Sequence, residues 1–181
     1  MTQKISDTKP VIDFIDMATR YCQLIEDREN KSEIQLLQEV IIILPQLCVY
    51  AMKLPDIKQL SDYEPSRIPH EQWEDIYKSL QHKLGEHDYY QEIFDPYQNK
   101  EEQVTASLAD DLADIYGDIK RGLQDWVKAS PSDRLHIIWY WKLDFDHWGA
   151  HATGAFRALY SLLYHHIEDK YGDYIGIRDE N

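Results

Sequence analysis

The sequence from residue 101 to residue 129 reads EEQVTASLADDLADIYGDIKRGLQDWVKA. Its apolar side chains recur every three or four positions and form one continuous stripe, made of Leu108, Leu112, Ile115, Ile119, Leu123 and Trp126. This spacing is typical of an amphipathic α-helix, whose apolar face packs on a core. The stretch therefore predicts one long helix over residues 101–129.

Three further helices are expected before this one. Apolar residues recur at helical spacing over residues 9–29 and predict the first helix. Pro10 lies in its first turn, a favoured place for proline. Ser32 and Gln35 have the spacing of a capping box, and the helix they start is apolar almost all round up to Pro45, where a kink is expected. Residues 70–84 form another amphipathic pattern, stopped by Gly85.

The C-terminal third predicts a final long helix. Ser130, Pro131 and Asp133 form a strong helix start, and the helical pattern continues to about residue 170. At about 1.5 Å per residue such a helix would be roughly 60 Å long, so a bend is expected near Gly149 or Gly154. His165 and His166 are interpreted as cations at its C-terminal end.

The loops and the missing strand patterns complete the fold prediction. Residues 54–69 contain three prolines and little periodicity, which indicates a surface loop within one domain. Residues 89–97 are rich in aromatic side chains around an Asp95-Pro96 turn, and are interpreted as a loop anchored on the core. No stretch alternates convincingly at period two. The prediction is an all-α protein, a single domain over residues 1–181, folded as an up-down bundle of about five helices.

Composition excludes several classes of function. The chain has 181 residues and a formal charge of −14, which disfavours binding to nucleic acid or to an anionic membrane surface. The longest aliphatic run, from Val40 to Leu44, is far shorter than the roughly 20 residues of a membrane span. The polar N-terminus and two cysteines at apolar helical positions, Cys22 and Cys48, predict a cytoplasmic protein with reduced thiols.

Four aspartates share one face of the predicted helix over residues 101–129: Asp110, Asp111, Asp114 and Asp118. They lie nearly opposite the apolar stripe, so the preferred interpretation is a solvated acidic face. The alternative is a site for a hard cation or a basic partner, because closely spaced carboxylates repel one another without one.

A second group of polar residues is spaced three and then four positions apart, namely Asp144, His147 and His151. Such residues stack along one helix face, and a His pair four residues apart is a recurrent metal-binding arrangement. The preferred alternative is a pair of core histidines held by hydrogen bonds. Arg157 lies among apolar residues and is expected to form an ion pair with an aspartate of the preceding helix.

Three runs of sequence resemble one known family. They are Tyr90-Gln-Glu-Ile-Phe-Asp-Pro-Tyr97, Ser107-Leu-Ala-Asp-Asp-Leu-Ala-Asp-Ile-Tyr116, and His147-Trp-Gly-Ala-His-Ala152 followed by Arg157-Ala-Leu159, with Leu54-Pro55 also matching. The family is catalogued as domain of unknown function five thousand and sixty-three. The resemblance implies an all-helical bacterial protein over nearly the whole chain, with no established activity and no catalytic residues to carry over.

Two looser resemblances concern chemistry. Asp111-Leu-Ala-Asp114 after Glu71-x-x-Glu74 is similar to the acidic motifs of magnesium-dependent all-α nucleotide pyrophosphohydrolases. His147-x-x-x-His151 is similar to a helix of bacterial four-helix metal proteins of the DNA-damage-inducible type, which would require a third ligand from His70, His82 or His87.

Two functions follow from these patterns. The preferred hypothesis is a module that binds a protein partner or a small molecule. The alternative is a metal-dependent hydrolase with a divalent metal cofactor. No glycine-rich phosphate loop, nucleophile elbow or Cys-x-x-Cys motif is present.

Overall fold

The computed structural model describes residues 5–58, 63–93, 97 and 103–166. Its helices are α2 (Lys9–Glu26), α3 (Glu33–Met52), α4 (His70–Leu84), α5 (Leu108–Trp126), α6 (Pro131–Leu143) and α7 (Phe145–Ser161). Two short strands, β1 (Tyr89–Glu92) and β2 (Val104–Ser107), separate α4 from α5, and a π-helical turn covers Leu162–His166. The prediction of a predominantly helical bundle is confirmed.

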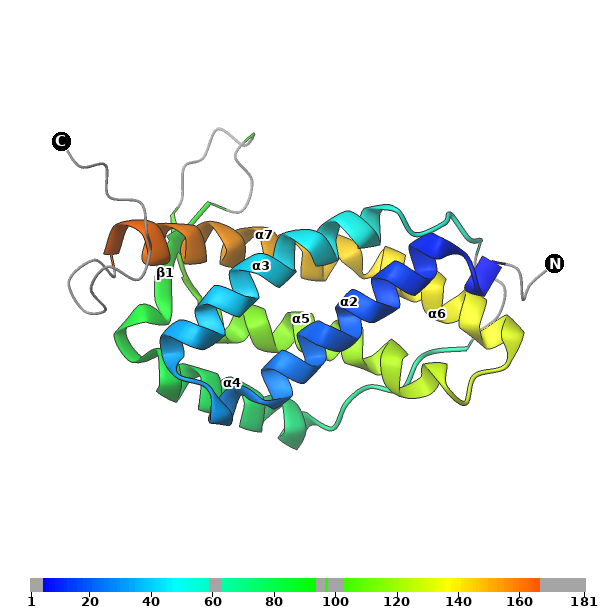
Figure 1. Cartoon of the computed structure of the whole chain (residues 1–181), viewed down its shortest axis with the longest axis horizontal. Coiled ribbons are helices and arrows are strands. Elements are labelled where there is room, and N and C mark those ends of the chain that lie inside the picture. Colours follow the sequence, from blue (N-terminus) through cyan, green and yellow to red (C-terminus); the bar gives the residue numbers. More distant parts are fainter. Residues whose placement is uncertain (1–4, 59–62, 94–96, 98–102, 167–181) are drawn as a thin grey trace.

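Helix α5 lies at the centre of this bundle. It contacts α2, α4, α6 and α7, while α3 packs on α2 and α7 from the other side. Figure 1 shows α2, α3, α5 and α7 running along the long axis of the molecule. The core between them is aliphatic and aromatic, and its largest fully buried side chains include Phe14, Tyr21, Leu44, Tyr116, Trp141 and Trp148. Because other helices cover α5 on several sides, a polar side chain of α5 can face a neighbouring helix instead of solvent.

Helix α5 starts later than the periodicity predicts. Its N-cap is Ser107, whose hydroxyl accepts a hydrogen bond from the backbone N–H of Asp110. Asp88, fully buried, accepts hydrogen bonds from the Ser107 hydroxyl and from the backbone N–H of Ala109. These contacts satisfy the free N–H groups of the first turn, so the helix begins at Leu108. Residues 101 and 102, the start of the predicted helix, lie outside the described residues.

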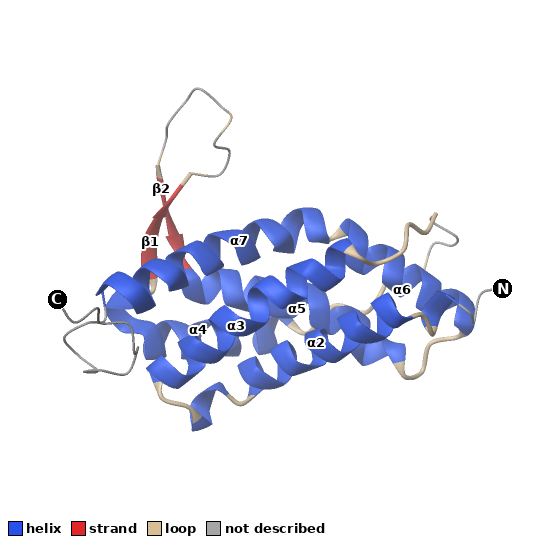
Figure 2. Ribbon diagram, turned by 45° about the horizontal axis from the view of Figure 1, so that its top comes forward, coloured by secondary structure: helices blue, strands red, loops and turns tan. Residues whose placement is uncertain are grey.

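The β-hairpin is a feature that sequence periodicity did not predict. Strands β1 and β2 pair antiparallel, with Tyr89 opposite Ser107 and Glu92 opposite Val104. Figure 2 shows the two strands standing out from the helices beside α7. Each strand has only four residues, too few for a clear alternation. The aromatic segment interpreted as a loop therefore begins as a strand, and the predicted Asp95-Pro96 turn lies outside the described residues.

The predicted C-terminal helix is divided into two. The break is at Asp144, which is the C-cap of α6 and the N-cap of α7, and not at either glycine proposed as a bend. The Asp144 backbone N–H donates to the Tyr140 carbonyl, and the Asp144 carbonyl accepts from the N–H groups of His147 and Trp148. Gly149 and Gly154 both lie inside α7 and are buried.

One helix, α3, is long and apolar enough to cross a membrane by length and composition. Seven of its residues are buried against neighbouring helices: Leu36, Leu37, Val40, Ile43, Leu44, Leu47 and Ala51. The same apolar composition is expected of a helix at the core of a bundle. Pro45 lies inside α3, which continues through it to Met52.

Candidate metal centre

The acidic face of α5 is turned toward α7. Asp111 is buried, with 5% of its side chain exposed, and the side chain of Asp114 is 28% exposed. Asp110 and Asp118 are half-buried. The interpretation of these aspartates as a solvated face is therefore wrong. The physical reason is that α7 packs against α5 and presents imidazole rings to the carboxylates. These imidazoles replace water as hydrogen-bonding partners of the carboxylates.

Each histidine of α7 meets an aspartate of α5 through Nδ1. His151 Nδ1 lies 2.8 Å from Asp111 Oδ1, and His147 Nδ1 lies 2.8 Å from Asp118 Oδ2. The two rings are edge to face, with centroids 4.8 Å apart. His147 is 62% exposed at its side chain and His151 is 22% exposed, so this pair lies at the bundle surface and not in its core.

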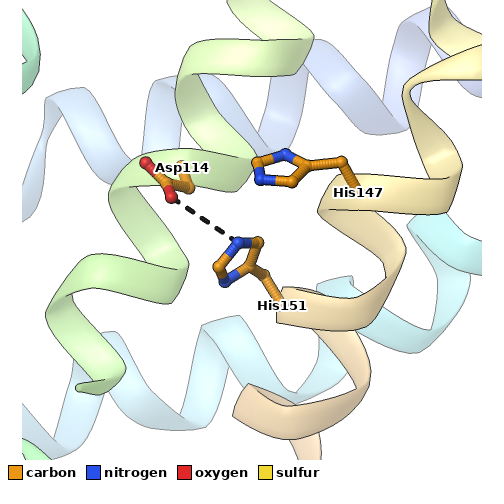
Figure 3. Close-up of side chains that lie close together, drawn as sticks. All are labelled: Asp114, His147 and His151. Carbon is orange, nitrogen blue, oxygen red and sulfur yellow. Dashed lines mark ion pairs between the residues drawn. The ribbon is translucent and has the colours of Figure 1, made fainter. Parts of the chain in front are cut away.

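The second nitrogen of each ring remains for another ligand. His151 Nε2 lies 3.5 Å from Asp114 Oδ2, and Figure 3 shows both rings extending from α7 toward Asp114. One ligand atom each from Asp114, His147 and His151 lies within 4.8 Å of the other two. Ligands about 2.0–2.1 Å from a tetrahedral metal ion stand roughly 3.4 Å apart, close to the His151–Asp114 separation.

Further contacts orient this group. The Trp73 indole N–H on α4 donates to Asp114 Oδ1 at 2.8 Å, which directs the other carboxylate oxygen toward His151. The Tyr90 hydroxyl on β1 donates to Asp111 Oδ2 at 2.7 Å. A carboxylate on the outer nitrogen of a ligating histidine is the usual arrangement around protein-bound metals, because it fixes the ring and its tautomer. Asp111 and Asp118 are placed for that role.

The charges around the site shift several pKa values. The hydrogen bond and charge of Asp111 raise the pKa of His151, even though burial acts in the opposite direction. Burial, together with Asp114 and Asp111, raises the pKa of Asp110. Burial also raises the pKa of Glu92. The imidazole of His151 therefore holds its proton more tightly than a solvent-exposed imidazole does. A metal cation bound there would take the place of that proton.

Asp144, expected to join the two histidines, is directed elsewhere. Its carboxylate lies 3.4 Å from Arg121, which also approaches Glu64 at 3.3 Å. Burial raises the pKa of Asp144 to about 6, and Arg121 opposes that shift. The structure thus groups Asp114, from a different helix, with His147 and His151, where the helical spacing had suggested Asp144.

Arg157 does not form the predicted ion pair. Within the described residues it contacts none of the four α5 aspartates at ion-pair distance, and its side chain is exposed. The physical reason is that His147 and His151 already occupy the carboxylates that face α7.

The other residues named in the two looser resemblances lie apart from this cluster. His87 pairs with Glu33, His82 is exposed, and Glu74 pairs with Lys78. His70 stacks on Trp73 with ring centroids 6.0 Å apart, and lines a cavity beside Asp114. None of them belongs to the ligand group found in the described part of the chain.

Comparisons with known proteins agree on the fold. The family model described as Domain of unknown function (DUF5063) matches residues 6–165, a range that contains every residue of the site. The crystal structure of protein BF1032 from Bacteroides fragilis is similar over 89% of this chain and 96% of that chain, with a TM-score of 0.80 and 26% sequence identity. No curated protein matches the sequence.

Proposed function

This chain belongs to the DUF5063 family, and we propose that it binds a divalent transition-metal ion through Asp114, His147 and His151. The observation that carries the proposal is the orientation of the two imidazoles. Each uses Nδ1 to contact an aspartate of α5, so that Nε2 is the nitrogen left to bind the ion. Two histidines and one carboxylate, each supported by an outer hydrogen bond, form a donor set that suits zinc, manganese or iron.

Three protein ligands leave coordination positions for water or for a substrate. A metal ion in such a site lowers the pKa of a bound water and supplies a hydroxide nucleophile near neutral pH. The chemistry best supported is therefore hydrolysis, the alternative function that the sequence suggested.

Access to the site supports this chemistry. A cavity of about 430 Å³ is lined by His147 and His151, and a second of about 400 Å³ is lined by Asp114 and Asp118. A small molecule can therefore approach the ligand group from either side of the α5–α7 contact. A binding module that works without a metal would use the same cavities, but its affinity for its ligand would not depend on an ion.

Calorimetric titration separates these two functions. Protein stripped with a chelator is titrated with Zn²⁺, Mn²⁺ and Ni²⁺, and we expect one ion per chain for at least one metal. His147→Ala should abolish binding without unfolding the bundle, because that side chain is 62% exposed. His82→Ala is the matched control: His82 is also an exposed histidine, and it lies outside the ligand group. No binding by wild type, or equal binding by His147→Ala, would overturn the proposal.

A further inference from the structure

We propose that the substrate of this centre is a small molecule carrying a phosphate group, which Arg157, Ser161 and His166 bind in a groove between β1 and α7. This inference rests on the proposed metal function, since it names what the metal centre acts upon. Its starting point is the position of Arg157 relative to the two histidines.

Arg157 lies where two cavities meet. The cavity of about 430 Å³ that contains His147 and His151 also has Arg157 in its lining. A neighbouring cavity of about 550 Å³ is lined by Arg157, Ser161 and His166. Because the two cavities share Tyr90, Gln91 and Arg157, they form one groove that runs along α7 from the metal ligands to the π-helical turn.

The charges along this groove are divided between its ends. Glu92 and Asp146 lie in the cavity with the metal ligands, where carboxylates favour a cation and repel an anion. Arg157 stands at the junction, and Ser161 and His166 lie beyond it, with Glu86 as the acidic side chain of that cavity. An anionic group is therefore favoured at the Arg157 end, with the reacting part of the molecule at the metal end.

Arg157 itself has the properties of an anion-binding residue. Among the described residues it forms no ion pair and donates no hydrogen bond, although the chain has a formal charge of −14. A guanidinium presents five N–H donors in a planar fork that matches the oxygens of a phosphate. The Glu92 carboxylate in the same cavity is near enough to interact electrostatically with Arg157, but it is not at ion-pair distance. The N–H donors of the guanidinium therefore remain able to bind the oxygens of a ligand.

Ser161 and His166 favour phosphate over carboxylate as that ligand. Ser161 follows Arg157 by four residues, so the two side chains lie on the same side of α7. Its hydroxyl and the His166 imidazole add donors to the fork of Arg157 in the same cavity. A phosphate group has enough terminal oxygens to accept from all three side chains, whereas two carboxylate oxygens are already used by the guanidinium.

The test uses inorganic phosphate as the probe and the full chain loaded with metal. Zinc binding is measured first, so that failure of the metal site is seen before phosphate is added. Phosphate is then titrated by calorimetry, and its ³¹P line is recorded with manganese-loaded protein. We expect saturable phosphate binding and a broadened ³¹P line, since the groove places phosphate near the paramagnetic ion.

Two arginine variants locate the binding site. Arg157→Gln should weaken phosphate binding by about tenfold or more, the effect of losing a charge-assisted hydrogen bond, and should leave zinc affinity unchanged. Arg67→Gln is the matched control, because Arg67 is also exposed but lines the cavity on the opposite side, next to Asp114. Ser161→Ala should weaken phosphate binding by a smaller factor.

The outcomes separate cleanly. Zinc binding without phosphate binding would overturn this inference and leave the metal function standing, whereas absence of both would overturn the two together. Loss of phosphate binding in Arg67→Gln but not in Arg157→Gln would place the anion in the other cavity and contradict the proposal. Acetate binding as tightly as phosphate, with the same dependence on Arg157, would contradict the choice of phosphate.

Discussion

Asp111 and His151 are 40 residues apart in the sequence and joined by a 2.8 Å contact between Oδ1 and Nδ1. The contact ties the first turn of α5 to the middle of α7. Tyr90 occupies the other oxygen of Asp111, so this carboxylate bridges a strand residue and an imidazole. Because Asp111 accounts for Nδ1, the opposite nitrogen of His151 faces Asp114.

This relationship gives the first prediction. Asp111→Asn keeps the size of the side chain but removes the charge that orients and polarises His151. We expect metal affinity to fall by about 10- to 100-fold with the stoichiometry unchanged, the usual effect of losing an outer-sphere carboxylate. Competition titration against a chromophoric chelator measures it. Asp110→Asn is the control, since Asp110 lies one position away and outside the ligand group. Equal affinities for Asp111→Asn and wild type would contradict the role given to Asp111.

The second prediction concerns two glycines in neighbouring helices. A Cβ on Gly154 would lie 2.7 Å from the Tyr90 hydroxyl and also against the Glu92 carboxylate, so Gly154→Ala must displace the ends of these two side chains and disturb the Tyr90–Asp111 hydrogen bond. We expect a loss of about 1 to 3 kcal/mol in the free energy of unfolding. A Cβ on Gly117 would be 3.7 Å from its nearest neighbours, so Gly117→Ala should stabilise the helix by about 0.5 to 1 kcal/mol. Urea unfolding measures the change in the free energy of unfolding for both variants. A change of the same sign in Gly154→Ala and Gly117→Ala would contradict this explanation.

The third prediction is a pH dependence of stability. Burial raises the pKa of Asp144 to about 6 from an ordinary value of 3.8. A carboxyl group whose pKa is raised on folding stabilises the fold fully below its unfolded pKa, and that contribution disappears as pH rises through 6. We expect wild type to lose about 1 kcal/mol relative to Asp144→Asn between pH 5 and pH 7.5.

Urea unfolding at several pH values, with a chelator present, measures this difference. Titrations common to both proteins cancel when the two curves are subtracted. Parallel stability profiles for wild type and Asp144→Asn would show that Asp144 does not carry the raised pKa.

The helices could be predicted where their signals are local. Helix α4 has the predicted bounds because Gly85 follows directly on its amphipathic pattern, and the capping box of Ser32 and Gln35 is present as predicted. The hairpin could not be predicted, because strands of four residues give too little alternation. The division at Asp144 was missed because the expected bend was assigned to glycines, whereas the two helices meet at Asp144 through backbone hydrogen bonds.

The candidate site was predicted in its parts but not in its pairing. The spacing of His147 and His151 gave metal binding as the alternative to a pair of core histidines, and Asp114 was placed on the acidic face of α5. Asp111, Asp114 and Asp118 repeat the three-then-four spacing of Asp144, His147 and His151, which is the signal that the two faces could match. Which helix packs on which is a tertiary property, so the aspartate that meets the histidines, and the contribution of Trp73 from α4, could not be derived from periodicity.

The most direct test of the proposed metal centre is elemental analysis of the protein purified without a metal-affinity tag or chelator, with His151→Ala prepared in parallel. We expect one equivalent of a divalent transition metal per chain in wild type, and loss of that metal in the variant while its circular dichroism spectrum stays helical. A wild-type protein free of metal that also fails to take up zinc, manganese or iron on addition would contradict it. So would a variant that retains the full equivalent.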